Sequence, residues 1–345
     1  MSTDHKHALH RVSMGGLLIS LGIIFGDIGT SPLYVFKAIF NKGEVQELMV
    51  YGGLSCIFWT LTLQTTIKYV LIVLNADNKG EGGILSLFSL VRKRAKWLII
   101  PAIIGASTLL ADGMITPAIT ISSAVEGLAI KNPGLPTIPI VVLIISLLFL
   151  IQRFGTNIVG RVFGPLMFIW FSTIGVLGLS YLGHSPEIWK SINPYYAYQL
   201  LANYPNAWFI VGAIFLCTTG AEALYSDMGH CGKNNIRISW IFVKLMLIFN
   251  YFGQGAWLLE NKGLVLGEIN PFYAIMPDWF VVWGVTIATI AAVIASQAMI
   301  SGSSPASRWT CWRSARDRWP APCRPASRRL CASPWWWRTA RVSPA

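Results

Sequence analysis

The sequence predicts an all-α polytopic membrane protein. Of its 345 residues, 54% are hydrophobic and only 12% are charged, whereas soluble domains carry about 25% charged residues. The apolar residues are gathered into segments, and about 20 apolar residues suffice to cross a bilayer. The segment 137–152 is at the short end of that range. Eight candidate spans are predicted, at residues 14–40, 50–74, 97–128, 137–152, 162–182, 207–228, 236–259 and 280–302.

Positive charges between these segments predict the orientation, because Lys and Arg are concentrated in cytoplasmic loops. With the N-terminus inside, eleven Lys and Arg fall on the inner side and four on the outer side. We therefore expect residues 1–13 to form a cytoplasmic arm and residues 14–302 to form the transmembrane region. No signal-peptide cleavage pattern precedes the first apolar run, so that run is expected to stay as a span.

Residues 76–96 are too short and too charged to cross a membrane. Apolar residues at helical spacing followed by a basic cluster predict a helix near residues 80–95, lying in the plane of the inner membrane surface. A cytoplasmic loop helix that packs on the rest of the protein would give the same pattern.

The tail, residues 303–345, differs in composition from the rest of the chain. It contains nine Arg and one Asp, so it supplies +8 of the net charge of +12, and it holds six of the fifteen Trp. It has neither a helical nor an alternating apolar period. We interpret this Arg/Trp/Pro-rich tail as an out-of-frame, disordered translation; the alternative is an arm that lies on anionic lipid. The basic charge therefore does not indicate a nucleic-acid partner.

Residues 26–34 (GDIGTSPLY) place an acidic residue inside the first apolar segment. An ionisable residue at membrane depth is costly, so Asp27 is a candidate functional residue. Gly26, Gly29 and Pro32 are expected to interrupt the helix, which is tolerated only where the backbone lines protein or a cavity. A carboxylate beside a broken helix is typical of a cation site. The alternative is a tilted helix in which Asp27 faces a packed polar neighbour.

Two further polar clusters lie in the third and sixth candidate spans. Asp112 and Thr116 are four residues apart, and Thr219 and Glu222 are three apart, so each pair is expected to share a helix face. Gly220 is expected to loosen the sixth span.

Carboxylates and hydroxyls are hard oxygen donors and favour a monovalent cation over softer metals, without indicating which ion. The alternative for Thr116, Thr218 and Thr219 is that they only bond carbonyls of their own helices. No nucleophile elbow, His-Glu-x-x-His or paired-Cys motif is present, so we expect no enzyme activity and no cofactor.

Four motifs together resemble the KUP (HAK/KT) potassium-uptake family: residues 26–34, 77–85 (DNKGEGGIL), 112–118 (DGMITPA) and 219–226 (TGAEALYS). The resemblance implies the inverted-repeat fold of the amino acid–polyamine–cation superfamily, with spans one and six broken. It also implies potassium uptake coupled to proton entry across the bacterial inner membrane. Potassium, the proton and membrane lipid are the expected partners, and a homodimer is one possible assembly.

The resemblance also implies roles for individual residues. Asp27 and Tyr34 would bind potassium with Thr116 and Thr219. Asp112 and Glu222 would complete the cation site, and either of these two carboxyl groups would carry the coupling proton.

The chain departs from the family pattern at residues 301–302, where the match stops. Family members have about twelve spans and a C-terminal cytoplasmic domain, so the second repeat is incomplete here. Alternating access needs one repeat to rock against the other, and we expect this chain to transport poorly. The alternatives are an amino acid permease of the same superfamily, against which Asp27 argues, or a non-transporting truncated membrane protein.

Overall fold

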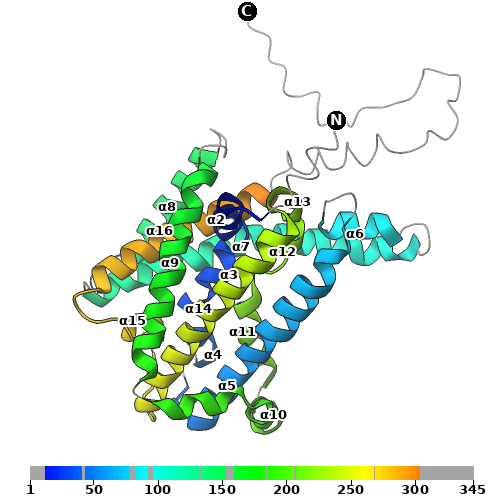
Figure 1. Ribbon diagram of the computed structural model, residues 1–345. Coiled ribbons are helices and arrows are strands. Elements are labelled where there is room, and N and C mark those ends of the chain that lie inside the picture. The colour runs from blue at the N-terminus through cyan, green and yellow to red at the C-terminus, as the bar shows by residue number, and fades with distance from the viewer. Residues whose placement is uncertain are drawn as a thin grey trace, which may run out of the picture. The chain divides into compact units, whose positions relative to one another are not determined.

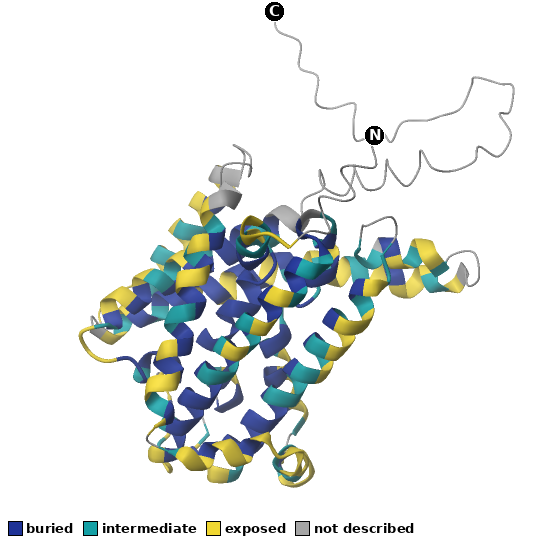
Figure 2. Cartoon of the chain, in the orientation of Figure 1, coloured by how far each residue is buried: buried dark blue, intermediate teal, exposed yellow. Residues whose placement is uncertain are grey.

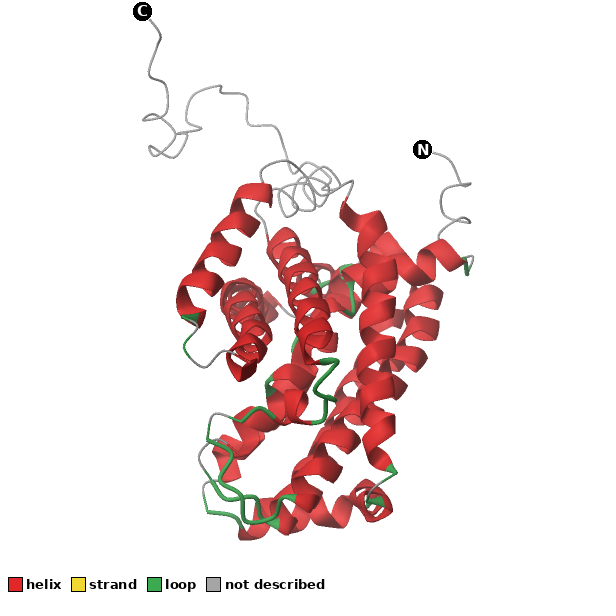
Figure 3. Cartoon of the chain, turned by 90° about the vertical axis from the view of Figure 1, so that its left-hand side faces the viewer, coloured by secondary structure: helices red, strands yellow, loops and turns green. Residues whose placement is uncertain are grey.

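The computed structural model describes residues 12–40, 43–77, 82–91, 96–131, 134, 136–152, 159–183, 185–205, 207–267 and 269–303. Within these ranges every regular element is a helix (Figure 3), apart from an isolated antiparallel bridge between Glu44 and Val265. The all-α prediction is confirmed for this part of the chain. Most of the predicted N-terminal arm, and the tail beyond residue 303, lie outside it.

The membrane-spanning part is made of long helices with shorter ones between them. The long elements are α5 (Glu47–Thr60) with its π-helical continuation η2 (Leu61–Ile72) and η3 (Val73–Asn75), α7 (Ile99–Lys131), α8 (Thr137–Gln152), α9 (Val159–Leu182), α14 (Lys233–Glu260) and α16 (Val281–Ser303). The short elements are α2 (Met14–Ile23), α3 (Gly26–Thr30), η1 (Ser31–Leu33), α4 (Val35–Phe40), α6 (Ile84–Val91), η4 (Lys96–Leu98), η5 (Pro186–Ile192), α10 (Pro194–Asn203), α11 (Ala207–Phe215), η6 (Leu216–Thr218), α12 (Ala223–Ser226), α13 (Met228–Cys231) and α15 (Pro271–Ala274).

Among the described residues, six helices are long and apolar enough to cross a membrane, and the bent pair Met14–Ile23 and Gly26–Leu33 makes a seventh. The predicted fourth span does form helix α8, but its apolar part, Thr137–Leu150, is shorter than the other spans. The structure thus supports a polytopic membrane protein with six or seven spans by length and composition, rather than the eight expected.

Close backbone contacts fix the neighbours of α14. In Figure 1, α14 runs between α9 and α5, and it packs against both. A Cβ atom at Gly253 would lie 2.5 Å from the Gly178 Cα, so only glycine allows α14 and α9 to approach this closely. Small residues serve membrane helices in this way because the backbones themselves come into contact.

Buried and exposed positions are distributed as expected for helices surrounded by lipid. Trp170, Phe171 and Phe252 are buried between helices, whereas Leu143 and Ile241 are more than half exposed. Figure 2 shows exposed positions along the outer faces of the helices and buried positions between them. Large apolar side chains exposed in such numbers are typical of contact with a membrane or a partner.

Helix α6 forms within the segment for which an in-plane helix is predicted, and it packs against α7. Its position at a membrane surface stays a prediction.

Candidate functional site

The first membrane segment is broken where the sequence predicts. Helix α2 ends at Ile23, α3 begins at Gly26 after a bend of 65°, and η1 follows at Ser31. Pro32 lies in the first turn of η1, where it lacks the N–H that a continuing α-helix would need. Asp27 lies in the first turn of α3 and is only 3% exposed.

Side chains from other elements bind the backbone carbonyls of this break. Trp170 Nε1 donates to Gly29 O (2.9 Å). Gln254 Nε2 donates to the carbonyl of residue 32 (3.1 Å), and Asn270 Nδ2 donates to that of residue 33 (2.8 Å). Buried carbonyls outside a regular helix need such partners, because an unpaired polar group at membrane depth costs several kcal/mol.

The sixth apolar segment is also broken. Helix α11 ends at Phe215, η6 follows, and residues 219–222 form a turn before α12 begins at Ala223. Gly220 has φ = +85°, a left-handed conformation that glycine adopts without steric cost. The predicted loosening at Gly220 is confirmed. The expectation that Thr219 and Glu222 share a helix face is wrong, because both lie in the turn.

The two breaks meet at Asp27. A Cβ atom at Gly220 would lie 2.6 Å from Asp27 Oδ2, closer than real atoms approach. Gly220 is therefore required twice, for its backbone conformation and for the space that the carboxyl group of Asp27 occupies. Segments almost 200 residues apart in the sequence are in contact here.

The carboxyl group of Asp27 has no hydrogen-bond partner among the described residues, and both of its oxygens are buried. Asp27 lies within electrostatic range of Asp112 and Glu222. Burying a charge is costly unless it is paired, and two nearby acidic groups raise that cost further. A proton or a cation bound at Asp27 would remove this cost.

Asp112 and Thr116 share one face of α7, as predicted, because Thr116 Oγ1 donates to Asp112 Oδ1 at 2.6 Å. The other oxygen of Asp112 is buried without a hydrogen-bond partner in the described part of the chain. Asp112 and Glu222 lie within electrostatic range of each other. Helix α7 thus brings the cluster of Asp112 and Thr116 to the same place as the two helix breaks.

Hydroxyl groups complete the cluster. Tyr34 is buried and donates to Ser31 Oγ at 3.4 Å. Thr219 lies near the same hydroxyl group. Thr218, in contrast, donates to the carbonyl of Phe215 in its own segment, which was the alternative considered for the threonines. We call Asp27, Tyr34, Asp112, Thr116, Thr219 and Glu222 the carboxylate cluster.

Sequence reasoning missed the residues that hold the cluster in place. Asn250 and Gln254 are polar residues four apart in the otherwise apolar stretch 245–259 of α14, a signal that could have found them. Asn270 follows a loop, and no pattern in the surrounding sequence indicates that it binds the first helix break. Glu126, near the end of α7, forms an ion pair with Lys37 of α4 and accepts a hydrogen bond from Asn270 (3.4 Å).

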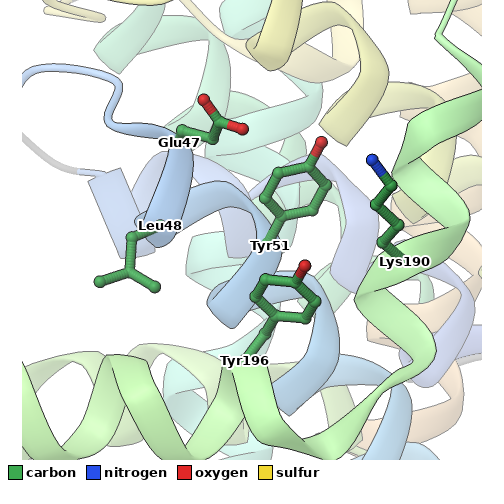
Figure 4. A pocket seen from close by; sticks show the side chains of 5 residues that line it. All are labelled: Glu47, Leu48, Tyr51, Lys190 and Tyr196. Atoms are coloured by element: carbon green, nitrogen blue, oxygen red, sulfur yellow. The ribbon is translucent and has the colours of Figure 1, made fainter.

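A separate surface pocket of about 330 Å³ is lined by Glu47, Leu48, Tyr51, Lys190 and Tyr196. Figure 4 shows the two tyrosine rings beside each other, 5.2 Å apart, with Lys190 facing them. A hydrogen bond to Glu187 raises the pKa of Lys190. None of the carboxylate cluster lines this pocket.

The fold and the cluster define a polytopic helical membrane protein with a buried carboxylate site at two helix breaks. Residues 14–307 match the family described as the K+ potassium transporter integral membrane domain. The chain belongs to this family of potassium transporters, as its motifs indicated.

Curated relatives are described as potassium transport system proteins. The chain is 60% identical to a probable potassium transport system protein Kup of Cytophaga hutchinsonii, over 93% of this chain and 50% of that protein. It is 57% identical to the Flavobacterium johnsoniae protein of the same description, over 93% and 51% of the two chains. A putative Kup 1 of Lactococcus lactis is 52% identical, over 88% and 47%. The chain spans about half the length of these relatives. No solved structure matches it.

Proposed function

We propose that this chain forms the cation-binding part of a potassium uptake transporter. The observation that carries the proposal is the meeting of two helix breaks at a buried carboxyl group, Asp27, which has no hydrogen-bond partner among the described residues. Transporters bind ions where broken helices leave backbone oxygens near acidic side chains. The relatives are named as potassium transport proteins, so potassium is the proposed ion.

Oxygen atoms of Asp27, Tyr34, Thr116 and Thr219 are the proposed ligands. Within the described residues, no three His, Cys, Asp or Glu side chains are placed to hold a metal ion together. A mixed set of hydroxyls, carbonyls and few carboxylates suits a monovalent ion that exchanges its water shell for neutral oxygens. Calcium, in comparison, is usually held by several carboxylates.

Proton coupling is assigned to the pair Asp112 and Glu222. Two carboxyl groups within electrostatic range of each other repel when both are ionised, so a proton at either one relieves the repulsion. Arrival of a cation near Asp27 favours release of that proton. This electrostatic link supports symport but does not say which of the two groups releases the proton.

The remaining parts of the proposal follow from the family. They are an inverted-repeat fold whose first and sixth spans are broken, a bacterial inner membrane, a cytoplasmic N-terminus, and an assembly that is a monomer or a homodimer. Reduced transport by a chain of this length also stays a proposal. No observation favours an amino acid permease.

The test is binding of rubidium-86 to the purified chain, displaced by potassium. We expect Asp27→Asn to weaken displaceable binding at least tenfold, because the change removes the charge that a bound cation would compensate. Asp278→Asn, at an exposed position in the loop before α16, is the matched control and should leave binding unchanged. Equal binding by the Asp27→Asn variant and the unsubstituted chain would refute the site.

A further inference from the structure

Gln254 is fully buried and links the first helix break to two other helices. Its Nε2 donates both to the carbonyl of Pro32 (3.1 Å) and to Asn250 Oδ1 (2.7 Å). Asn250 in turn donates to the carbonyl of Ile174 in α9 (2.9 Å). The position of the Pro32 carbonyl is thereby tied to α9 and α14, whose backbones are in contact at Gly178 and Gly253.

Asn270 ties the end of the same break to α15. Its Nδ2 donates to the carbonyl of Leu33 (2.8 Å), while its Oδ1 accepts from the N–H of Phe272 (3.1 Å) and caps α15. The side chain is 3% exposed. The oxygen of this amide therefore serves its own helix, and its NH2 group serves the broken segment and, at 3.4 Å, Glu126 of α7.

These two amides act on carbonyls that lie between Asp27 and Tyr34 in the sequence. A hydrogen bond fixes the direction in which a carbonyl points and limits how far the segment can shift. Selectivity between cations depends on the number and spacing of the surrounding oxygens. A segment held at two consecutive carbonyls cannot adjust its spacing to an ion of another radius as freely as a loose one.

We propose that Gln254 and Asn270 are positioning residues that determine cation selectivity: by holding the carbonyls of Pro32 and Leu33 they fix the spacing of the oxygens around Asp27. This inference rests on the proposed function of the carboxylate cluster. It assigns to both amides an effect on the ratio of affinities for different ions, in addition to their effect on stability.

The first test is Asn270→Asp, which keeps the oxygen that caps α15 and removes the NH2 group that binds Leu33 and Glu126. Displacement of rubidium-86 by potassium, sodium and caesium gives the affinity ratios of the purified chain. A typical buried hydrogen bond contributes about 0.5–1.5 kcal/mol. We therefore expect the preference for potassium over sodium to fall about three- to tenfold.

Asn235→Asp is the matched control. Asn235 is equally buried, its Oδ1 accepts from the N–H of Ser13, and its Nδ2 donates to the carbonyl of Cys231 (2.8 Å). The same isosteric change there introduces the same charge, away from the break. Asn235→Asp should lower the thermal stability as Asn270→Asp does and leave the ion ratios unchanged.

Gln254→Met tests the inference through the second amide without adding a charge. If Asn270→Asp does not give a monodisperse protein, Gln254→Met alone tests whether the amides determine the ratio of ion affinities. The same fall in the ion ratio is expected. Unchanged ratios in a variant that still binds rubidium would overturn the inference and leave the proposed function standing. Absence of displaceable rubidium binding in the unsubstituted chain would refute the proposed function itself.

Discussion

At the scale of single residues, Gly220 and Asp27 explain why the two helix breaks come together. Gly220 has a left-handed conformation, and its missing side chain leaves the space that the carboxyl group of Asp27 occupies. Neither property depends on which ion binds. Because Gly220 and Asp27 are in contact, the breaks in the first and sixth apolar segments form one polar site.

Gly220→Ala is expected to weaken rubidium binding at least tenfold and to destabilise the fold by about 1–2 kcal/mol, the usual cost of a left-handed residue other than glycine. Gly263 offers a matched control, since it has φ = +83° but a Cβ atom added there would meet no atom within 4 Å. Gly263→Ala should show the stability cost in a thermal unfolding assay and bind rubidium normally. Equal binding by both variants would contradict the role of the contact.

At the scale of elements, the sequence predicts the helix breaks but not the side chains that bind the backbone carbonyls of those breaks. Gly26, Gly29 and Pro32 interrupt a helix for local reasons that the sequence displays. The amide of Asn270 binds a carbonyl 237 residues away, and no local pattern encodes such a partner. Thr219 and Glu222 show the converse error, because a helical spacing was assumed across a segment that forms a turn.

Trp170→Phe tests the support of the first break. The change removes the N–H that binds the carbonyl of Gly29 and keeps an aromatic ring beside Phe272. We expect a loss of about 1–3 kcal/mol in stability, because a buried carbonyl loses its partner, together with weaker rubidium binding.

Trp240→Phe is the control for that experiment. Trp240 is also buried, but its Nε1 donates to Thr66 in η2 rather than to the first break. It should reduce stability in a thermal unfolding assay and leave rubidium binding intact. If both tryptophan variants bind rubidium as the unsubstituted chain does, the hydrogen bond to Gly29 only serves stability.

At the scale of the whole molecule, the apolar composition predicts the membrane-protein class and the motifs predict the family. The sequence predicts the number of spans less well, because composition alone does not decide whether the short apolar run at 137–150 crosses the membrane. Orientation rests on charge asymmetry and stays a prediction. Only the family resemblance implied that the three polar clusters lie together. No local pattern shows it, since it depends on how α3, α7 and the turn at 219–222 pack.

Cysteine reactivity measures whether the whole fold is present. Cys56, Cys217 and Cys231 are buried thiols, and burial raises the pKa of Cys231 to about 12. The reactive thiolate of Cys231 is therefore almost absent at pH 8 and increases only as the pH rises toward that value.

In a variant that carries Cys311→Ser, Cys323→Ser and Cys331→Ser, we expect N-ethylmaleimide at pH 8 to leave the native chain unlabelled. Denaturation in sodium dodecyl sulfate should allow all three remaining thiols to react, which mass spectrometry detects. Rapid labelling of the native chain would contradict the described packing of these cysteines.

Anomalous scattering from crystals grown with thallium or rubidium in place of potassium would locate a bound cation and is the most direct test of the proposed site. We expect a peak in contact with Asp27, beside Tyr34 and Thr219, which disappears in Asp27→Asn. A cation located only in the pocket of Glu47 and Tyr51, or a peak that persists in Asp27→Asn, would contradict the proposed site.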